Sequence, residues 1–233
     1  MSVKGGPNTV TSGLVLELDA GNIKSYQSGS TTWYDKSGFA NNGTLINGVG
    51  YTSSFNGSLV FDGVDDYVST NNSSSLTQAG NTQFTAELWA KKTASDKDLL
   101  MGAQDQSTLK GWFLQWFGNN IVYFGVRNGG SNYNYCTLPY QNQWFNIVGV
   151  FDGSQPTDDT KNKIYVNGVQ QTLTTTTQLT SVPTNLVQLT IGTVVNYSSY
   201  TAANIAIAKI YNQALSADQV LQNYNATKTR FGL

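Results

Sequence analysis

Two acidic side chains near the start of the chain have a spacing that could support hydrolysis of a glycosidic bond. Glu17 and Asp19 are alternate residues along a predicted strand that begins at Leu14. Their side chains therefore leave the same face, with Cα atoms about 6.5–7 Å apart. A retaining glycosidase uses two carboxyl groups about 5–5.5 Å apart. The chain contains no histidine, which excludes Ser–His and Cys–His catalysis and the common zinc sites, so carboxylates are the acid–base candidates.

A second acidic group lies in a turn between two strand-like runs, over residues 62–66. Asp62, Asp65 and Asp66, together with Asp19, could supply several oxygen ligands to a calcium ion. The alternative is a solvated turn in which the Asp side chains accept hydrogen bonds from nearby amides. We predict a structural calcium ion at these four residues. A looser acidic group with the same donor chemistry lies later in the chain: Asp152, Asp158 and Asp159.

Aromatic residues supply a third kind of site, because rings can stack on sugar faces while neighbouring amides bond the hydroxyls. The run 84–91 alternates, so Trp89 leaves the polar face, where an indole either lies under a loop or offers a flat platform. Over residues 112–135, aromatic residues are interleaved with asparagines. We predict carbohydrate contacts from five residues: Trp89, Arg127, Asn128, Asn132 and Tyr133.

The elements that must position these residues are short strands, which recur between turn signals along nearly the whole chain. This spacing is typical of a β-sandwich or barrel. Asn-Gly pairs supply the positive φ angles of tight hairpins. One helix is predicted near the C-terminus, where Ser216 and Gln219 form a capping box and Leu215 is placed to pack on Val220. We expect this helix to cover the open end of the sandwich.

Composition excludes several classes of partner. Charged residues make up 12% of the chain and the net charge is -1, so no long-range field attracts a polyanion and nucleic acid is not expected. No apolar run approaches the roughly 20 residues that a membrane span needs. The N-terminal segment has no signal-peptide core, and the single cysteine, Cys136, agrees with synthesis in a reducing compartment.

Four motifs, taken in order, resemble the laminin-G-like concanavalin A-type lectin/glucanase family: the runs 13–22, 33–38, 58–68 and 210–216. The resemblance implies an all-β, concanavalin A-like jelly-roll β-sandwich of two antiparallel sheets with a short C-terminal helix. It also implies structural calcium in many members. The glucanase pattern requires a further Glu on the face of Glu17, but Gly21 and Asn22 follow Ala20, so the acid that would donate the proton is missing. We therefore predict that the protein is not an enzyme.

We find no linker that would divide the chain. We predict a single domain over residues 13–227, with an N-terminal arm (1–12) and a C-terminal tail (228–233). The arm and the tail carry Pro7, Phe231 and Leu233, which a purely solvated segment would not need, so we expect them to anchor the protein to a partner surface.

The opening and closing segments, residues 6–16 and 224–233, are similar to laminin-G-like virion proteins of tailed bacteriophages. This resemblance implies a virion surface protein of the capsid-decoration or head or tail fibre type, made in the host cytoplasm without a signal peptide. Its expected partners are virion or sister subunits, as a homo-oligomer, and host or environmental polysaccharides. Two alternatives stay open: a purely structural decoration protein without glycan binding, and a glucanase-type hydrolase.

Overall fold

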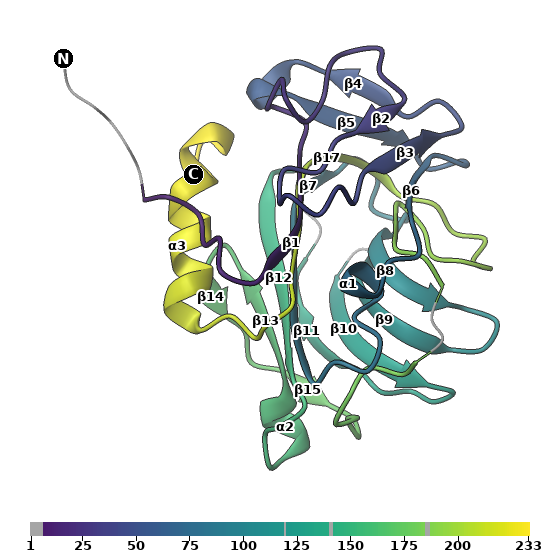
Figure 1. The fold of residues 1–233 in the computed structure, drawn as a ribbon, viewed down its shortest axis with the longest axis vertical. Coiled ribbons are helices and arrows are strands. Elements are labelled where there is room, and N and C mark those ends of the chain that lie inside the picture. Colours follow the sequence, from purple (N-terminus) through teal and green to yellow (C-terminus); the bar gives the residue numbers. More distant parts are fainter. Residues whose placement is uncertain (1–6, 119, 140–141, 185–186) are drawn as a thin grey trace.

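The computed structural model describes residues 7–118, 120–139, 142–184 and 187–233, which form a two-layer β-sandwich (Figure 1). Every strand pair within the two sheets is antiparallel. The predicted fold class, two antiparallel sheets with a short C-terminal helix, is confirmed. None of the helices in the described part of the chain is long and apolar enough to cross a membrane.

One sheet, which we call sheet A, contains eight strands. Its long central strands pair along their whole length, and the last strand of the chain pairs with β7 on one side and with both β1 and β5 on the other. The strands, in sheet order, are β14 (Val169–Gln170), β13 (Asn162–Val166), β12 (Phe145–Asp152), β7 (Gln83–Lys92), β17 (Ala202–Tyr211), β5 (Ser58–Asp62) and β4 (Gly50–Thr52), with β1 (Leu14–Asp19) beside β17.

The opposite sheet, sheet B, contains nine strands. Three consecutive long strands, β8 to β10, form its centre as a meander. The strands, in sheet order, are β15 (Thr174–Thr175), β11 (Asn134–Thr137), β10 (Ile121–Asn128), β9 (Lys110–Phe117), β8 (Leu99–Asp105), β16 (Thr190–Ile191), β6 (Tyr67–Thr70), β3 (Gly43–Ile46) and β2 (Thr32–Trp33).

Helices are few and short. The longest described helix, α3, begins after the Ser216 cap, whose hydroxyl accepts from the Gln219 amide while the Gln219 side chain accepts from the Ser216 amide. The predicted capping box is thereby confirmed. The helices are η1 (Ser54–Asn56), α1 (Ser74–Thr77), α2 (Asp158–Lys161), α3 (Ala217–Thr227) and η2 (Lys228–Phe231), the two η elements being 3-10 turns.

The main core lies between the sheets and is built from the inward side chains of alternating strands. Phe84 of sheet A contacts Trp112 and Phe124 of sheet B, with ring centroids 5.1 and 5.6 Å apart. Each of these three rings is fully buried. Such aromatic pairs contribute about 0.5–1.5 kcal/mol beyond the burial of their area, and they fix the spacing of the two layers.

The C-terminal helices cover the outer face of sheet A instead of the open end of the sandwich (Figure 1). Val220 packs with Leu215 over the outward side chains Val148, Val150 and Tyr165 of β12 and β13. The end-covering position expected from the sequence is therefore wrong. The physical reason is that the outer faces of β12 and β13 are apolar, and burial of such a face favours a covering helix.

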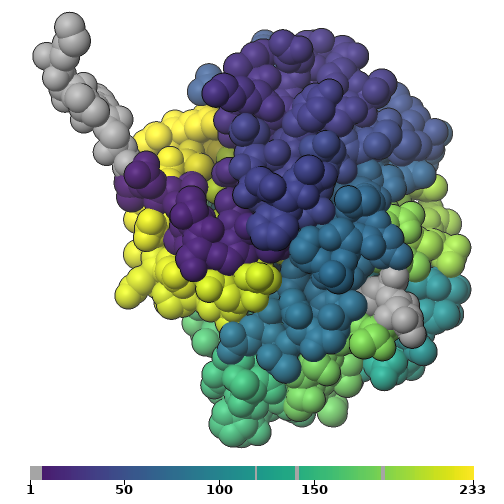
Figure 2. All heavy atoms as spheres, in the orientation of Figure 1, coloured from purple at the N-terminus to yellow at the C-terminus, as the bar shows by residue number. Residues whose placement is uncertain are grey.

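The two ends of the described chain also belong to the folded unit. The Val10 amide donates to Asn223 Oδ1 of α3 (2.8 Å), and the Asn8 carbonyl accepts from Gln222 (2.7 Å). Figure 2 shows the N-terminal residues, in purple, lying against the yellow C-terminal segment. At the other end, Phe231 is buried. The expectation that residues 228–233 form a separate tail is therefore wrong, because Phe231 fills an apolar site on sheet A.

Candidate functional site

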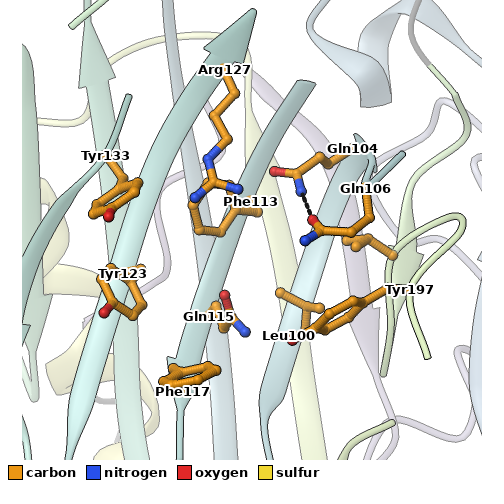
Figure 3. A pocket seen from close by; sticks show the side chains of 11 residues that line it. Leu100, Gln104, Gln106, Phe113, Gln115, Phe117, Tyr123, Arg127, Tyr133 and Tyr197 are labelled. Carbon is orange, nitrogen blue, oxygen red and sulfur yellow. Dashed lines mark hydrogen bonds between the residues drawn. The ribbon is translucent and has the colours of Figure 1, made fainter. Parts of the chain in front are cut away.

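The outer face of sheet B carries a groove of about 210 Å³ (Figure 3). Strand alternation produces it: on β9, Trp112 and Leu114 face the core, whereas Phe113 and Gln115 face outward. The loop between β16 and β17 forms one wall. The lining residues are Leu100, Gln104, Gln106, Phe113, Gln115, Phe117, Tyr123, Arg127, Tyr133, Val194 and Tyr197.

One half of the groove is lined by the rings of Phe117 on β9, Tyr123 on β10 and Tyr133 just before β11. Tyr135 of β11 lies beside them without lining the groove, and we call these four residues the aromatic row. Tyr123 is at its centre, with ring centroids 5.0 Å from Tyr133, 5.5 Å from Tyr135 and 6.0 Å from Phe117. Burial raises the pKa of Tyr123, so its phenol stays protonated and can donate and accept hydrogen bonds. Phe117 is 46% exposed and presents apolar surface to solvent.

Arg127 of β10 lies over the floor of the groove. Its guanidinium carbon is 4.4 Å from the centroid of the Phe113 ring and 5.0 Å from that of Tyr133. The Phe113 ring has room to lie flat because its β10 neighbour is Gly125, where a Cβ atom would come 2.9 Å from Phe113 and 2.8 Å from Tyr133. Arg127 Nε is buried and has no hydrogen-bond partner. Burial also lowers the pKa of this guanidinium, although arginine remains charged in proteins.

The other half of the groove is lined by amides. Gln104 is buried and donates to Gln106 Oε1 (2.6 Å), while its own Oε1 has no partner. Gln115 donates to Asp98 Oδ2 (2.9 Å), which also accepts from the Tyr197 hydroxyl (3.1 Å). Asp98 thus holds two lining side chains in place through hydrogen bonds.

A second hollow of about 500 Å³ lies beside the groove, across the β16–β17 loop. The two share Val194 and Tyr197, so Tyr197 forms part of both walls. Hydroxyl and amide side chains dominate the second hollow. Its lining residues are Tyr67, Gln188, Thr190, Thr193, Val194, Val195, Asn196, Tyr197, Ser198 and Tyr200.

The chemistry available in the groove is binding through rings, amides, phenols and one cation. No Asp or Glu occurs among its described lining residues. A glycosidase needs two carboxyl groups beside the scissile bond. The groove therefore lacks the acid–base groups for that reaction.

The five predicted carbohydrate contacts do not lie together in the structure. Arg127 and Tyr133 line the groove. Asn128 is exposed at the end of β10 and lines a different, shallow hollow, and Asn132 donates to the Thr177 carbonyl (2.8 Å). Trp89 does point to the outer face of sheet A, as alternation predicts, but it is fully buried.

Trp89 is not an exposed platform because the C-terminal segment covers it. Its indole stacks on Phe231, with centroids 4.2 Å apart, and on Tyr224, at 5.8 Å. The prediction that Trp89 offers a ring to a sugar is therefore wrong. The five predicted contacts do not include Phe117, Tyr123 or Gln104, although Phe117 and Tyr123 belong to the aromatic segment 112–135 that the sequence indicates. The signal for these two rings is their odd-numbered position on β9 and β10, which they share with Arg127.

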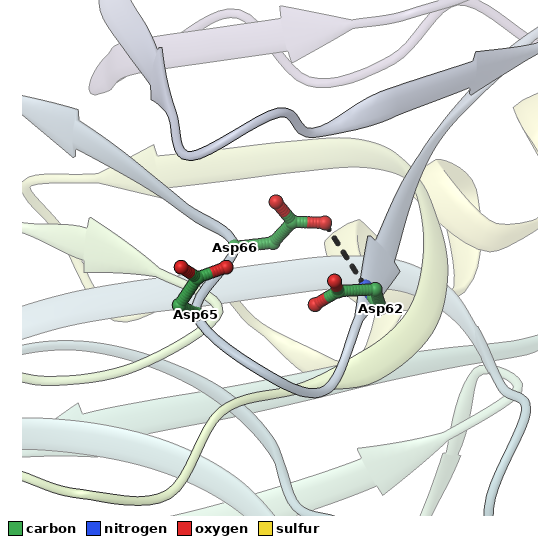
Figure 4. Close-up of side chains that lie close together, drawn as sticks. All are labelled: Asp62, Asp65 and Asp66. Carbon is green, nitrogen blue, oxygen red and sulfur yellow. Dashed lines mark hydrogen bonds between the residues drawn. The ribbon is translucent and has the colours of Figure 1, made fainter.

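The acidic turn brings three of the four predicted calcium ligands together (Figure 4). Asp62, Asp65 and Asp66 each offer a carboxylate oxygen within 4.8 Å of the others. Asp66 is 3% exposed; its Oδ2 accepts from the Asp62 amide (3.0 Å), and its Oδ1 is buried without a partner. Burial raises the pKa of Asp66. An orphaned carboxylate oxygen beside two others is chemistry that suits a divalent cation.

Asp19 is not part of this turn cluster. It lies 2.6 Å from Arg230 Nη1, and Glu17 lies 3.1 Å from Lys209 Nζ. The two carboxylates project from the same face of β1, as predicted, but each is paired with a different cation, Lys209 on β17 and Arg230 on η2. Of the looser acidic group, Asp152 accepts hydrogen bonds from Gln83, Ser154 and Gln155, and Asp158 pairs with Lys161.

Comparison with known proteins shows that the fold belongs among lectin-like folds. A family model described as the concanavalin A-like lectin/glucanases superfamily matches residues 62–221. No curated protein sequence matches the chain.

Solved structures with a similar fold include the receptor-binding domain of the botulinum neurotoxin C/D mosaic serotype (TM-score 0.68, 16% identity, 92% of this chain and 51% of that one). Two structures of the binding domain of botulinum neurotoxin DC are also similar. One is in complex with rat synaptotagmin II (TM-score 0.67, 15% identity, 94% of this chain and 52% of that one). The other is in complex with SialylT (TM-score 0.66, 15% identity, 93% of this chain and 52% of that one). The chain spans about half the length of these domains, and at such identity the likeness is one of fold.

Proposed function

Because the chain belongs to the concanavalin A-like lectin/glucanases superfamily, we propose that it is a non-catalytic module that binds a glycan in the groove on sheet B. The observation that carries this proposal is the lining of the groove, which combines three rings of the aromatic row with three glutamines and contains no described carboxylate. The fold alone does not assign the activity, since the superfamily holds binding modules and hydrolases. The side chains of the groove favour binding.

Sugar rings have an apolar face and a polar rim, and the two halves of the groove match these surfaces. The aromatic row gives flat apolar area to the face, and Gln104 and Gln106 give amide groups to the hydroxyls. Amide and phenol groups both donate and accept, which suits hydroxyls of either orientation. Net hydrogen-bond energies of about 0.5–1.5 kcal/mol predict weak binding at a single site.

The glycan is proposed to be a chain of several residues. The groove and the second hollow share Tyr197, and together they extend from β11 across β8 to the β16–β17 loop. A monosaccharide would occupy only part of this surface. Tyr197 would then contact neighbouring sugar units on its two sides.

The test is binding of a clustered protein to immobilised polysaccharides, because multivalency raises weak affinities by about 10²–10⁴-fold. Tyr123→Ala removes the central ring of the aromatic row and is expected to weaken binding by about 3- to 10-fold. Phe39→Ala is the matched control, since Phe39 is 56% exposed and lies outside the groove. Equal binding by wild type and Tyr123→Ala would overturn the assignment of the groove.

We also propose, as an expectation from the resemblance, that the protein functions on a virion surface. A neutral, hydroxyl- and amide-rich surface and a weak binding site are compatible with display in many copies. Mass spectrometry and cryo-EM of particles that contain this chain would test the location. A particle-bound protein whose clustered form binds no glycan would favour the purely structural decoration role.

The acidic turn is proposed as a calcium site of Asp62, Asp65 and Asp66, without Asp19. The specific observation in its favour is the buried, unpartnered Oδ1 of Asp66. A cation there would supply the charge that this oxygen lacks and would tie β5 to β6. This role concerns stability and is independent of the glycan proposal.

A further inference from the structure

Arg127 is a cation without an anion. Among the described residues it makes no ion pair and no hydrogen bond, and its guanidinium lies against the rings of Phe113 and Tyr133. The chain has only one other arginine, Arg230, which is fully committed to Asp19, Phe55 and Gly57. A half-buried guanidinium that lacks a counter-ion has lost part of its hydration without compensation.

The groups around Arg127 do not provide that compensation. The titratable groups that interact with it are the phenols of Tyr123, Tyr133 and Tyr197. Asp98 already accepts from Gln115, Tyr197, Ser199 and the Gly118 amide. The guanidinium is therefore available to a ligand.

The position of Arg127 suits a ligand group inside the groove. Figure 3 shows the guanidinium pointing down from β10 into the groove, between Tyr133 and Gln104. Gln104 Oε1 is buried, lacks a partner and lies on the Arg127 side. The site thus places a planar donor fork and a free acceptor on either side of one space. A carboxylate or sulfate accepts from such a fork, and a neighbouring hydroxyl donates to the amide oxygen.

Building on the proposed glycan function, we propose that the groove selects sugars that carry an anionic group, a carboxylate or a sulfate ester, and that Arg127 is the selecting residue. Neutral glycans would stack on the aromatic row but would leave the guanidinium unpaired. The expected difference is about 10- to 100-fold in affinity, the range for a charge-assisted hydrogen bond.

The first experiment compares matched polysaccharides that differ in charge alone. Clustered full-length protein is presented with polygalacturonate and alginate, each beside its carboxyl-reduced form, and with dextran sulfate beside dextran. We expect each anionic member that binds to exceed its neutral counterpart by at least 10-fold. The carboxylate and sulfate arms distinguish the two sources of charge.

Two variants assign the preference to Arg127. Arg127→Gln should lower the affinity for the anionic member by at least 10-fold and so remove the preference, and Gln104→Glu should also lower that affinity by placing a carboxylate opposite the guanidinium. Lys163→Gln, a change of the same charge on sheet A, should leave it intact. Circular dichroism confirms that each variant is folded.

A spectroscopic readout does not depend on avidity. With two arginines, the protein gives two Nε–H signals in a ¹H–¹⁵N spectrum, and Arg127→Lys identifies one of them. Galacturonate at millimolar concentration should shift the Arg127 signal, galactose should not, and the Arg230 signal should serve as the internal control.

The outcomes separate this inference from the proposed function. Equal binding of neutral and anionic members, or equal loss of both in Arg127→Gln, overturns the inference and leaves glycan binding standing. Failure of the clustered wild type to bind any polysaccharide, with no shift of the Arg127 signal, overturns both.

Discussion

The buried carboxyl of Asp66 makes the stability of the protein depend on pH. Its folded pKa is raised by burial, so the unfolded chain loses this proton at lower pH than the folded protein. Stability is therefore lost as pH rises through the interval between the ordinary value of about 3.9 and the raised one. The penalty is fully present at neutral pH when no cation is bound.

Replacing Asp66 with Asn should therefore stabilise the metal-free protein at pH 7. We expect a gain on the order of 1 kcal/mol, or about 2–4 °C in Tm, because the buried charge without a partner is removed. The gain should shrink as pH falls and should vanish at about pH 3, one unit below the ordinary pKa, where the wild-type carboxyl is protonated in both states. Thermal unfolding of the metal-free protein at pH 3 and pH 7 measures both values.

Calcium should reverse the order of the two proteins. The wild type should gain stability with rising calcium according to mass action, and Asp66→Asn should not. Asp218→Asn, at an exposed helix position, is the control. A wild-type Tm that is the same in EDTA and in calcium would contradict the proposed metal site.

The candidate site could be predicted in part at this scale. Alternation placed Arg127 and Tyr133 outward on sheet B, because a strand repeats every two residues whatever packs on it. The same rule placed Trp89 outward on sheet A. Whether an outward ring is exposed depends on a segment some 140 positions later in the chain, and strand periodicity carries no information about that contact.

At the scale of elements, the C-terminal turn η2 covers part of the outer face of sheet A. Phe231 lies against Trp89 and Trp144, with centroids 4.2 and 4.7 Å apart, and Arg230 is paired with Asp19. Without this turn, Trp89 and Trp144 would both lose the ring that packs on them from the C-terminus. Phe231 therefore acts as part of the core.

Phe231→Ala is expected to destabilise the protein by about 3–5 kcal/mol, the range for removing a buried phenylalanine. Urea unfolding followed by tryptophan fluorescence should show the loss together with exposure of Trp89 and Trp144. Leu233→Ala, at a residue that is 42% exposed, should change stability by less than about 0.5 kcal/mol. An unchanged midpoint in Phe231→Ala would mean that η2 is a detachable tail, as first expected from the sequence.

Helix α3 illustrates what the sequence could and could not specify about elements. The capping box located its start, because the pairing of Ser216 with Gln219 is local. Its place on the outer face of sheet A depends on Asn223, which donates to Glu87 of β7 and accepts from the Val10 amide. These partners are more than 130 positions away, so local patterning could not identify them.

At the scale of the whole molecule, the groove and the chain ends lie on opposite layers. Residues 8–10 and the C-terminal helices pack on sheet A (Figure 1). The groove opens on the outer face of sheet B. The thickness of the sandwich separates them, since packed sheets lie about 10 Å apart.

This arrangement predicts that fusion partners at either end leave binding intact. Joining the same trimeric coiled coil to the N-terminus or to the C-terminus should give two trimers with equal avidity for a polysaccharide, within about threefold. Surface plasmon resonance on immobilised polysaccharide measures both. A large deficit confined to one fusion would show that the corresponding end approaches the groove.

Along β9 and β10, side chains that face the groove alternate with side chains that face the core, and this pattern affects how the protein can evolve. Odd-numbered positions of these strands face the groove and even-numbered positions face the core, so codons for ligand contact and for folding alternate along the same gene segment. Substitutions at Gln115, Phe117 or Tyr123 can therefore accumulate while Leu114, Trp116 and Val122 are held constant. We expect divergent copies of this module to differ in preferred sugar long before they differ in fold.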